Sequence, residues 1–332
     1  MMKTIQTKFY YPILLISIVL LIVLTMAAFM FGADQYQFKD VYQALFDYQN
    51  TQVQNVLRDI RMPRVIAALL VGMALSCSGA VMQGVTKNPL ADPALIGINA
   101  GAMFAISVLF GVMPDTSFIS VLLVGFLGAL VGGTIVLMLG MSQRGGFNTI
   151  RIILAGAAVS ALLTALSQGV SLFFKTNQVS NLWTSGGVKG VTWSQIMMSA
   201  PLIIVVLIVL MFLSHRLTVM SLGEELAQGL GVNTSNMRLL FSLLTMLLAG
   251  TAVAIAGNLA FVGLIVPHIA RYLAGTDYKR VLPLTLVLGG LFIVMSDMIA
   301  RLMNDITINA VVSVIGVPFF IYLVRKDGKI HE

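Results

Sequence analysis

Residues 58–101 read RDIRMPRVIAALLVGMALSCSGAVMQGVTKNPLADPALIGINAG, and the order of features in this stretch decides the class of fold. A helix-length apolar run follows Arg61 and Arg64, which are expected to hold the start of the helix at a water interface. Pro89 and Pro93 forbid one continuous helix at the far end, so a polar break must precede the Gly-rich segment that follows. An apolar helix anchored in this way predicts a membrane-spanning segment.

The composition of the whole chain points to the same solvent. Of its 332 residues, 58% are hydrophobic and 10% are charged, and the mean hydropathy is +0.96. A soluble globular domain carries about 25% charged residues, so this chain cannot cover itself with polar surface and must lie largely in lipid. Its one cysteine, Cys77, lies inside an apolar run, which excludes a disulfide within the chain and a cysteine-based zinc site.

The apolar runs give the number of crossings, since a bilayer core needs about 20 apolar residues per helix. Ten runs meet this description: 12–31, 63–83, 94–113, 118–140, 152–174, 196–213, 237–256, 258–274, 281–300 and 308–324. The last part of this series is nearly continuous over 237–274, and we divide it at the turn signal Gly257-Asn258. A chain with nine spans is the alternative.

Positive charge sets the orientation. With ten spans and the N-terminus inside, 13 of the 20 Lys and Arg residues fall on cytoplasmic segments and 7 on outer ones. This bias has the sign of the positive-inside rule, which explains the net charge of +7 without nucleic acid. The prediction is an all-α polytopic protein of the plasma or inner membrane with about ten transmembrane helices. Residues 1–332 form one transmembrane domain, with a short cytoplasmic N-terminus (1–11) and a cytoplasmic C-terminus.

The cytoplasmic connection 215–237 contains a short helix of its own. Ser221 and Glu224 form a capping-box pattern at its start, and Gly231 supplies a stop. Between them, an apolar stripe recurs every four residues at Leu222, Leu226 and Leu230. The stripe predicts an amphipathic helix over about 221–231. This helix either lies on the chain's own membrane domain or docks a partner protein, and the spacing favours neither alternative.

Near the outer end of the ninth run, Asp297 and Arg301 stand four residues apart in the favourable acid-before-base order. They predict a helical ion pair, although ionisable groups within spans are also functional candidates. Gly128-x-x-x-Gly132 predicts a close helix crossing. The chain has no Walker A sequence, HExxH or nucleophile elbow, so nothing indicates covalent chemistry.

The run RMPRVIAALLVGMALSCSGAVMQGVTKNPLADPALIGINAGA at 61–102 is similar to the signature of iron-siderophore, haem and cobalamin importer permeases, the membrane subunits of type II ABC importers. Further matches follow in the family's order: IILAGAAVSALL at 152–163, SLGEELAQGLGV at 221–232, AFVGLIVPHIARYLAGTDYKRVLP at 260–283, SDMIAR at 296–301 and IGVPFFIYLVRK at 315–326. The resemblance therefore covers nearly the whole chain beyond the first apolar run. It implies a fold like that of the cobalamin-importer permease.

The resemblance also implies partners and an energy source. The expected assembly has a second permease subunit (identical or paralogous), two cytoplasmic ABC ATPases and an extracytoplasmic substrate-binding protein. ATP and Mg are then used by the ATPases, this chain is not an enzyme, and it binds no cofactor or metal. The first choice of cargo is an iron-siderophore complex, with haem and cobalamin as alternatives. A rival of another class is an ion-coupled secondary transporter, and a membrane-embedded enzyme is the third.

Site residues follow from the same matches. Arg61, Arg64 and Arg301 resemble outer arginines that engage carboxylates of the binding protein. The helix that couples to the ATPase is expected to use Ser221, Leu222, Gly223, Glu224, Glu225, Leu226, Leu230 and Gly231. The cytoplasmic end of the path is expected to be constricted by Asn88, Leu90, Thr149 and Ile150. By their polar or aromatic character, Gln168, Ser171 and Phe174 are candidates for lining the path, and ordinary helix packing is the alternative.

Two segments depart from the family pattern. Gly257-Asn258-Leu259-Ala260 replaces a Gly-Pro-Ile-Gly-like stretch, and Ile306-Thr307-Ile308-Asn309-Ala310 replaces a Glu-Leu-Pro-x-Gly stretch. The second change puts in question how the outer end of the last helix borders the substrate entrance.

Overall fold

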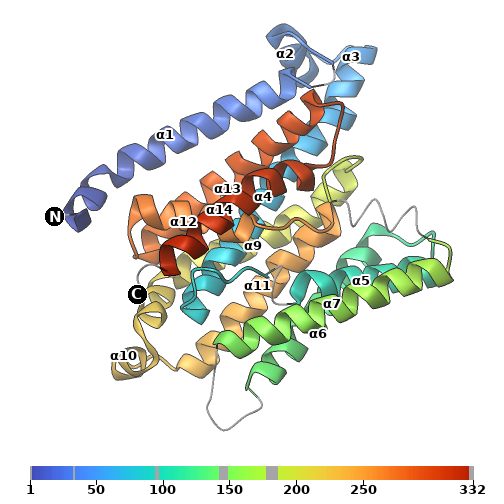
Figure 1. Cartoon of the computed structure of the whole chain (residues 1–332). Coiled ribbons are helices and arrows are strands. Elements are labelled where there is room, and N and C mark those ends of the chain that lie inside the picture. The colour runs from blue at the N-terminus through green and yellow to red at the C-terminus, as the bar shows by residue number, and fades with distance from the viewer. Residues whose placement is uncertain (1, 33, 94–96, 142–148, 177–185, 329–332) are drawn as a thin grey trace.

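The computed structural model describes residues 2–32, 34–93, 97–141, 149–176 and 186–328, and these residues form helices and connecting segments without a strand. The helices are α1 (Met2–Met30), α2 (Phe38–Phe46), α3 (Gln52–Asn55), the π-helical turn η1 (Val56–Arg61), α4 (Met62–Thr86), α5 (Ile98–Val112), α6 (Phe118–Met141), α7 (Thr149–Phe173), α9 (Trp193–Leu222), α10 (Glu224–Gly229), α11 (Thr234–Ala256), α12 (Val262–Ala274), α13 (Tyr278–Leu302) and α14 (Ile308–Gly328). Figure 1 shows most of the long helices running in roughly the same direction through one bundle.

The spans agree with the ten apolar runs. Among the described residues, seven helices are long and apolar enough to cross a membrane, and three shorter apolar helices (α5, α12 and α14) occupy the remaining runs. The shortest, α12, has 13 residues, which reach only about 20 Å at 1.5 Å per residue, against a core of about 30 Å. The prediction of an all-α membrane protein with about ten apolar helices is therefore confirmed, although α12 and the 15-residue α5 are both shorter than a bilayer core.

Several helix boundaries differ from the prediction. The first helix runs back to Met2, through the segment expected to be a short cytoplasmic N-terminus. In the middle of the chain, α5 begins at Ile98 rather than 94, because Gly97 adopts a left-handed conformation (φ +80°) that interrupts helical geometry. At the cytoplasmic face, α9 continues to Leu222 because no glycine or proline lies between the predicted end at 213 and Gly223. The division at Gly257 is confirmed, since its φ of +65° ends α11.

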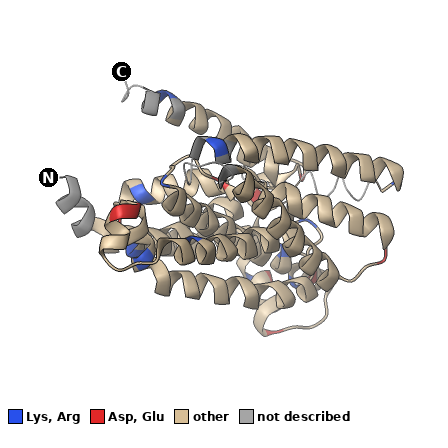
Figure 2. Ribbon diagram, turned by 90° about the horizontal axis from the view of Figure 1, so that it is seen from below, with Lys and Arg blue, Asp and Glu red and all other residues tan. Residues whose placement is uncertain are grey.

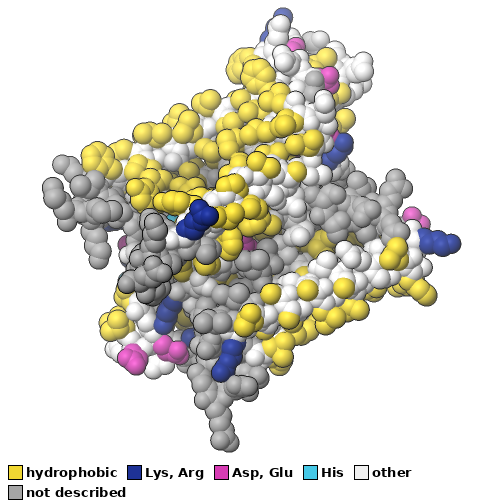
Figure 3. Space-filling model, viewed as in Figure 1, with side chains coloured by type: hydrophobic (Ala, Val, Ile, Leu, Met, Phe, Trp, Pro, Cys, Tyr) yellow, Lys and Arg dark blue, Asp and Glu magenta, His cyan; other side chains and the backbone are white. Residues whose placement is uncertain are grey.

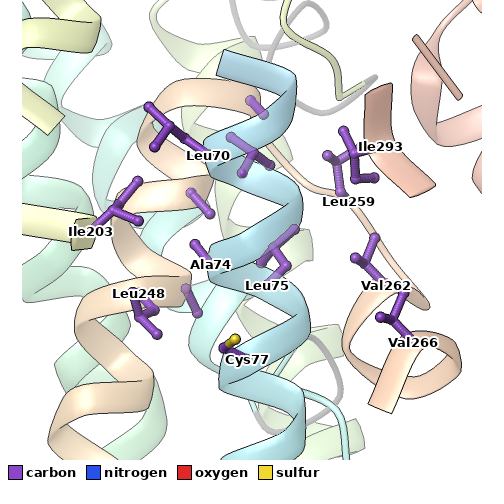
Figure 4. Close-up of a cluster of buried hydrophobic side chains, with 14 of the residues drawn as sticks. Leu70, Ala74, Leu75, Cys77, Ile203, Leu248, Leu259, Val262, Val266 and Ile293 are labelled. Carbon is purple, nitrogen blue, oxygen red and sulfur yellow. The ribbon is translucent and has the colours of Figure 1, made fainter. Parts of the chain in front are cut away.

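The first span of the quoted stretch, α4, is the central helix of the bundle and packs against α9, α11, α12 and α13. Figure 4 shows its buried side chains meeting those of the neighbouring helices: Leu70, Ala74, Leu75 and Cys77 lie among Ile203, Leu248, Val262, Val266 and Ile293. The backbones approach closely, since a methyl group at Gly72 would overlap the Gly289 carbonyl of α13. Small residues thus let the helices pack where lipid supplies no hydrophobic drive between them.

The predicted GxxxG crossing joins α6 to α5. A side chain at Gly128 would overlap the carbonyl of Gly101, and a side chain at Gly132 would lie 3.0 Å from the Cα of Gly101. Only hydrogen fits at these positions, so the two glycines fix how closely the helices approach. Together with α7, these helices form the part of the bundle at the lower right of Figure 1.

The two ends of the bundle are distinct. At one end, the Tyr10 hydroxyl donates to the Arg280 carbonyl (3.1 Å) and the Thr218 hydroxyl donates to the Asp277 carboxylate (3.1 Å), which ties α1 and α9 to α13. Figure 1 places α10, the start of α1 and the end of α14 on this side, and α2 and α3 on the opposite side. Figure 2 shows long uncharged stretches between the two ends. Both termini therefore lie on the side predicted to be cytoplasmic.

Candidate functional site

Arg61 lies inside the protein rather than at a water interface. It is 7% exposed, and its guanidinium donates to the carbonyls of Phe29 and Met30 (both 3.1 Å) and of Asp34 (2.9 Å). The same group lies 4.5 Å above the ring of Tyr36. The expectation of an exposed Arg61 is thus wrong. The end of α1 presents carbonyls that have no partner within the helix, and a guanidinium with five donors satisfies several of them at once.

Arg301 is the second buried arginine at this end. Its Nη1 donates to the carbonyls of Ala28 (2.9 Å) and Phe31 (3.0 Å), while its Nε lies 3.0 Å from the Asp297 carboxylate. The predicted ion pair between Asp297 and Arg301 is confirmed. A Cβ at Gly32 would lie 3.0 Å from a guanidinium nitrogen of Arg61 and 3.1 Å from one of Arg301. The two arginines therefore meet across the chain that leaves α1.

Arg64 forms ion pairs with two aspartates, Asp297 and Asp305. Its Nε donates to Asp297 (2.8 Å) and its Nη2 donates to Asp305 (2.6 Å), whose other oxygen lies 2.5 Å from Lys189 Nζ. We call Arg64, Lys189, Asp297, Arg301 and Asp305 the outer charge cluster. Partial burial raises the pKa of Asp305, but the hydrogen bonds from its two basic partners outweigh this effect, so that its pKa lies below the ordinary value.

The three arginines predicted to dock the binding protein are thus brought together at the outer end, and each has partners within the chain. Lys189 and Asp305 were missed by sequence reasoning. Both lie in loops, and no periodicity or motif connects a lysine that precedes α9 with an aspartate that follows α13. Lys189 keeps a side chain 73% exposed, which leaves it the most accessible cation of the outer charge cluster.

At the cytoplasmic end, the three leucines of the predicted apolar stripe are exposed, but they do not lie on one helix: Leu222 ends α9, Leu226 lies in α10 and Leu230 follows it. Leu222, Leu226 and Leu230 are 59%, 61% and 66% exposed, whereas Ala227 is the buried residue of α10. The stripe therefore does not lie on the chain's own membrane domain. Acidic side chains mark the same corner of the molecule in Figure 3. Such an apolar face, unpaired within the chain, is typical of a surface that another protein covers.

The start of α10 differs from the predicted capping box. Ser221 lies in the last turn of α9, where its hydroxyl donates to the Thr218 carbonyl (2.7 Å), and Gly223 is the N-cap residue of α10. The predicted helix of 221–231 is therefore shorter, because Gly223 separates it from α9. Its end agrees with the prediction, since Gly231 has φ +79° and the Val232 amide donates to the Ala227 carbonyl (3.0 Å).

Contacts with α11 fix the position of α10. Glu224 accepts a hydrogen bond from Thr234 (3.2 Å) and pairs with Arg238 (3.3 Å). Beside them is a cleft of about 730 Å³ between the end of α9 and the start of α11. Glu224 thus ties α10 to the membrane-spanning helix α11. Glu225, the neighbouring residue of the predicted set, is exposed.

The predicted cytoplasmic gate is only partly described. Asn88 and Leu90 lie in the turn after α4, where the Asn88 side chain accepts a hydrogen bond from the Leu90 amide (2.9 Å). Lys87 takes the left-handed conformation that ends α4 (φ +53°). Thr149 and Ile150 begin α7, but their side chains lie outside the described residues. The gate assignment therefore stays a prediction.

The path candidates lie on α7 and just beyond its end, in different environments. Gln168 is exposed, whereas Ser171 is buried and donates to the Ser167 carbonyl (2.9 Å). Phe174 packs edge-on against Phe173 (5.1 Å between ring centroids). The contact of Ser171 is that of an ordinary packed helix residue, so Gln168 is the better candidate for lining a path. As for metals, no group of three ligating side chains gathers among the described residues.

Comparison with known proteins places the whole architecture in one family. The FecCD transport family matches residues 20–326. The iron(3+)-hydroxamate import system permease protein FhuB of Bacillus subtilis (strain 168) is 40% identical, covering 96% of this chain and 85% of the relative. The iron-uptake system permease protein FeuB of the same organism is 36% identical, covering 90% and 91%.

A solved structure agrees with this grouping. A metal-chelate type ABC transporter in an inward-facing conformation superposes with a TM-score of 0.80 at 28% identity. The match covers 96% of this chain and 99% of that chain. The similarity of fold therefore extends over almost the whole chain.

Proposed function

Because the chain belongs to the FecCD transport family, we propose that it is the permease subunit of an ATP-driven importer. It carries an iron-siderophore complex from an extracytoplasmic binding protein to the cytoplasm. The observation that carries this proposal is the match over residues 20–326, which includes both the outer and the cytoplasmic ends of the bundle. Haem and cobalamin are the alternative cargoes, and the hydroxamate permease among the relatives supports the siderophore.

The energy enters through α10. Leu226 of α10 and the flanking Leu222 and Leu230 are exposed and suit a cleft on a cytoplasmic ATPase, because burying a leucine side chain contributes about 1.5–3 kcal/mol. ATP and Mg are used by that partner, and two ATPases serve a pair of permease subunits, identical or paralogous. The link from Glu224 to Thr234 and Arg238 would then transmit the movement of α10 to α11.

At the outer face, Arg61, Arg64 and Arg301 dock the binding protein. Arginine suits this role because its planar fork can bind a carboxylate through two hydrogen bonds. The clustering of the three side chains at one end supports the assignment, although each now binds groups of its own chain. Docking must therefore exchange internal partners for those of the binding protein.

The cargo then passes between the two permease subunits. Gln168, Ser171 and Phe174 contribute to its path, and Asn88, Leu90, Thr149 and Ile150 constrict the cytoplasmic end. The path binds cargo weakly, because a transported molecule must leave as readily as it enters.

The ion-coupled rival needs an acidic group that can change its charge within the membrane. Asp297 is buried on α13, but two arginines lie within 3.0 Å of its oxygens. Both of its carboxylate oxygens are thus engaged in ion pairs within the chain, near the outer end of the bundle rather than at its middle. This arrangement favours the ATP-driven reading.

Reconstitution tests the proposal. Proteoliposomes containing the permease, its ATPase and the binding protein should accumulate labelled iron-siderophore only with ATP and Mg. Vesicles with an ATPase variant unable to hydrolyse ATP are the matched control. Accumulation by the permease alone, driven by a proton or sodium gradient, would show that the chain is a secondary transporter instead.

A further inference from the structure

The outer charge cluster borders a cleft that opens at the outer face. Its volume is about 430 Å³, and Arg64, Lys189, Asp305 and the segments around Gly187 and Thr307 line it. Asp305 lies at the centre of the charges, with a side chain 25% exposed between the guanidinium of Arg64 and the ammonium of Lys189. A carboxylate of this chain thus occupies the place where two cations could bind a carboxylate from outside.

The two loops that form the cleft are those that no motif predicted. The Gly187 amide donates to the Ala256 carbonyl (2.7 Å), so the loop with Lys189 is anchored to the end of α11. On the other side, Asn304 and Asp305 both take the left-handed conformation (φ +59° and +58°). Asparagine and aspartate tolerate this conformation better than most residues. The backbone thereby turns Asp305 toward its two cations.

The charges of the region leave an excess of positive charge. Among the described residues, Arg64, Lys189 and Arg301 form ion pairs with two carboxylates, Asp297 and Asp305, while the neighbouring Arg61 is also attracted by Asp34. Asp297 is fully buried and belongs to the interior, whereas Asp305 stands on an exposed turn. If Asp305 turned away, Arg64 would keep Asp297 as a partner and Lys189 would point into solvent. The cleft would then be a cationic pocket of the right size for an acidic side chain.

We propose that Asp305 is an internal substitute for a carboxylate of the extracytoplasmic binding protein, and that Lys189 is a further docking cation. On docking, an acidic side chain of the binding protein enters the cleft and takes the place of Asp305 on Arg64 and Lys189. This inference rests on the proposed importer function and adds to it a residue that competes with the partner.

The exchange of Asp305 for a carboxylate of the binding protein leaves the number of ion pairs unchanged, because one carboxylate replaces another. Arg64, whose side chain is 12% exposed, is never left without an acidic partner, so the step avoids the cost of an unpaired buried charge. The competition also keeps the affinity moderate, which lets the binding protein leave after it has delivered its cargo. Charge complementarity at a partly exposed rim acts on the association rate and its salt dependence.

The test measures binding of the purified binding protein to the complete permease–ATPase complex in nanodiscs, without transport. Asp305→Asn should tighten binding about fivefold, since an exposed charge pair contributes up to about 1 kcal/mol. Lys189→Glu should weaken it about tenfold, and both differences should shrink in 0.5 M salt. Lys175→Glu is the matched control, because Lys175 is exposed after α7 and does not line the cleft.

The results distinguish a failure of the proposed importer function from a failure of the proposed exchange at Asp305. If the wild-type complex binds no binding protein at all, the proposed importer function fails and this inference fails with it. If the wild type binds but Asp305→Asn does not tighten the complex, or Lys189→Glu weakens it no more than Lys175→Glu does, the inference alone is overturned. Lys189 is well exposed, so Lys189→Glu remains a valid test even if Asp305→Asn unfolds.

Discussion

The substitution Asp297→Asn tests the buried centre of the outer charge cluster. The carboxylate is fully buried, and its oxygens lie 2.8 Å from Arg64 and 3.0 Å from Arg301. Asparagine keeps the shape of the side chain but removes the charge. Arg301, which is 5% exposed, would then retain only the carbonyls of Ala28 and Phe31 as partners.

The expected loss of stability depends on which partners Arg64 and Arg301 retain in the Asp297→Asn variant. Removing one partner of a buried ion pair costs about 3–5 kcal/mol, because it leaves an uncompensated charge. Here Arg64 retains Asp305 and Arg301 retains two carbonyls. We therefore expect a loss near the lower end, about 3 kcal/mol, in the free energy of unfolding measured by denaturant titration in lipid–detergent micelles.

Two further variants make this measurement decisive. Glu224→Gln removes the charge from the cytoplasmic pair with Arg238, where the Glu224 side chain is 48% exposed, so its cost should stay within about 1 kcal/mol. The double variant Asp297→Asn/Arg301→Gln should recover much of the lost stability, because no unpaired charge remains. A stability of Asp297→Asn within about 1 kcal/mol of wild type would refute the reasoning.

Three other variants probe the remaining features. Leu226→Ala should weaken ATPase binding to the purified permease about five- to tenfold. The melting temperature of the permease should not change, since the Leu226 side chain is 61% exposed in the free chain. If the variant binds the ATPase as tightly as wild type does, Leu226 is not part of the ATPase contact. Gly128→Val should cost about 1–3 kcal/mol of stability by forcing α6 from α5, whereas Gly169→Ala, with nothing within 4 Å of the new methyl, should be neutral or stabilising by up to about 1 kcal/mol. Because the pKa of Asp305 is lowered in the folded protein, its ion pairs stabilise the fold fully above about pH 4, and this stabilisation is lost as the pH falls through the folded-state pKa. The acid-denaturation curve of Asp305→Asn should lack this part of the pH dependence. A curve identical to that of wild type would contradict the expectation.

The span pattern could be predicted because it depends on local properties of the chain. A run of about 20 apolar residues has no stable alternative to a helix in lipid, since every backbone polar group must find its partner within the segment. The break at Gly257 and the stop at Gly231 are likewise local, because both require a positive φ that glycine adopts without strain. The capping box at Ser221 failed because the pattern cannot show whether the preceding helix has already ended.

The candidate sites likewise include features that local sequence predicts and contacts that depend on tertiary packing. The spacing of Leu222, Leu226 and Leu230 predicted one apolar stripe, whereas the structure divides it at Gly223 and shows that the three side chains are exposed. The docking arginines were predicted as exposed groups, yet Arg61 and Arg301 bind the end of α1, more than 25 residues away from either in sequence. No rule of local sequence predicts which carbonyls a guanidinium will find, because that depends on where two helix ends come to lie.

The sequence by itself determined that the chain is a bundle of apolar helices with a positive inner face and a short cytoplasmic helix that ends before Gly231. These features follow from hydropathy, charge counts and turn residues, which act over a few neighbouring positions. Only the tertiary structure decided that Lys189 and Asp305, 116 positions apart, share one ion pair beside Arg64. Electrostatic pairing is set by distances of a few ångströms in space, and the packing of α4, α13 and two loops fixes those distances.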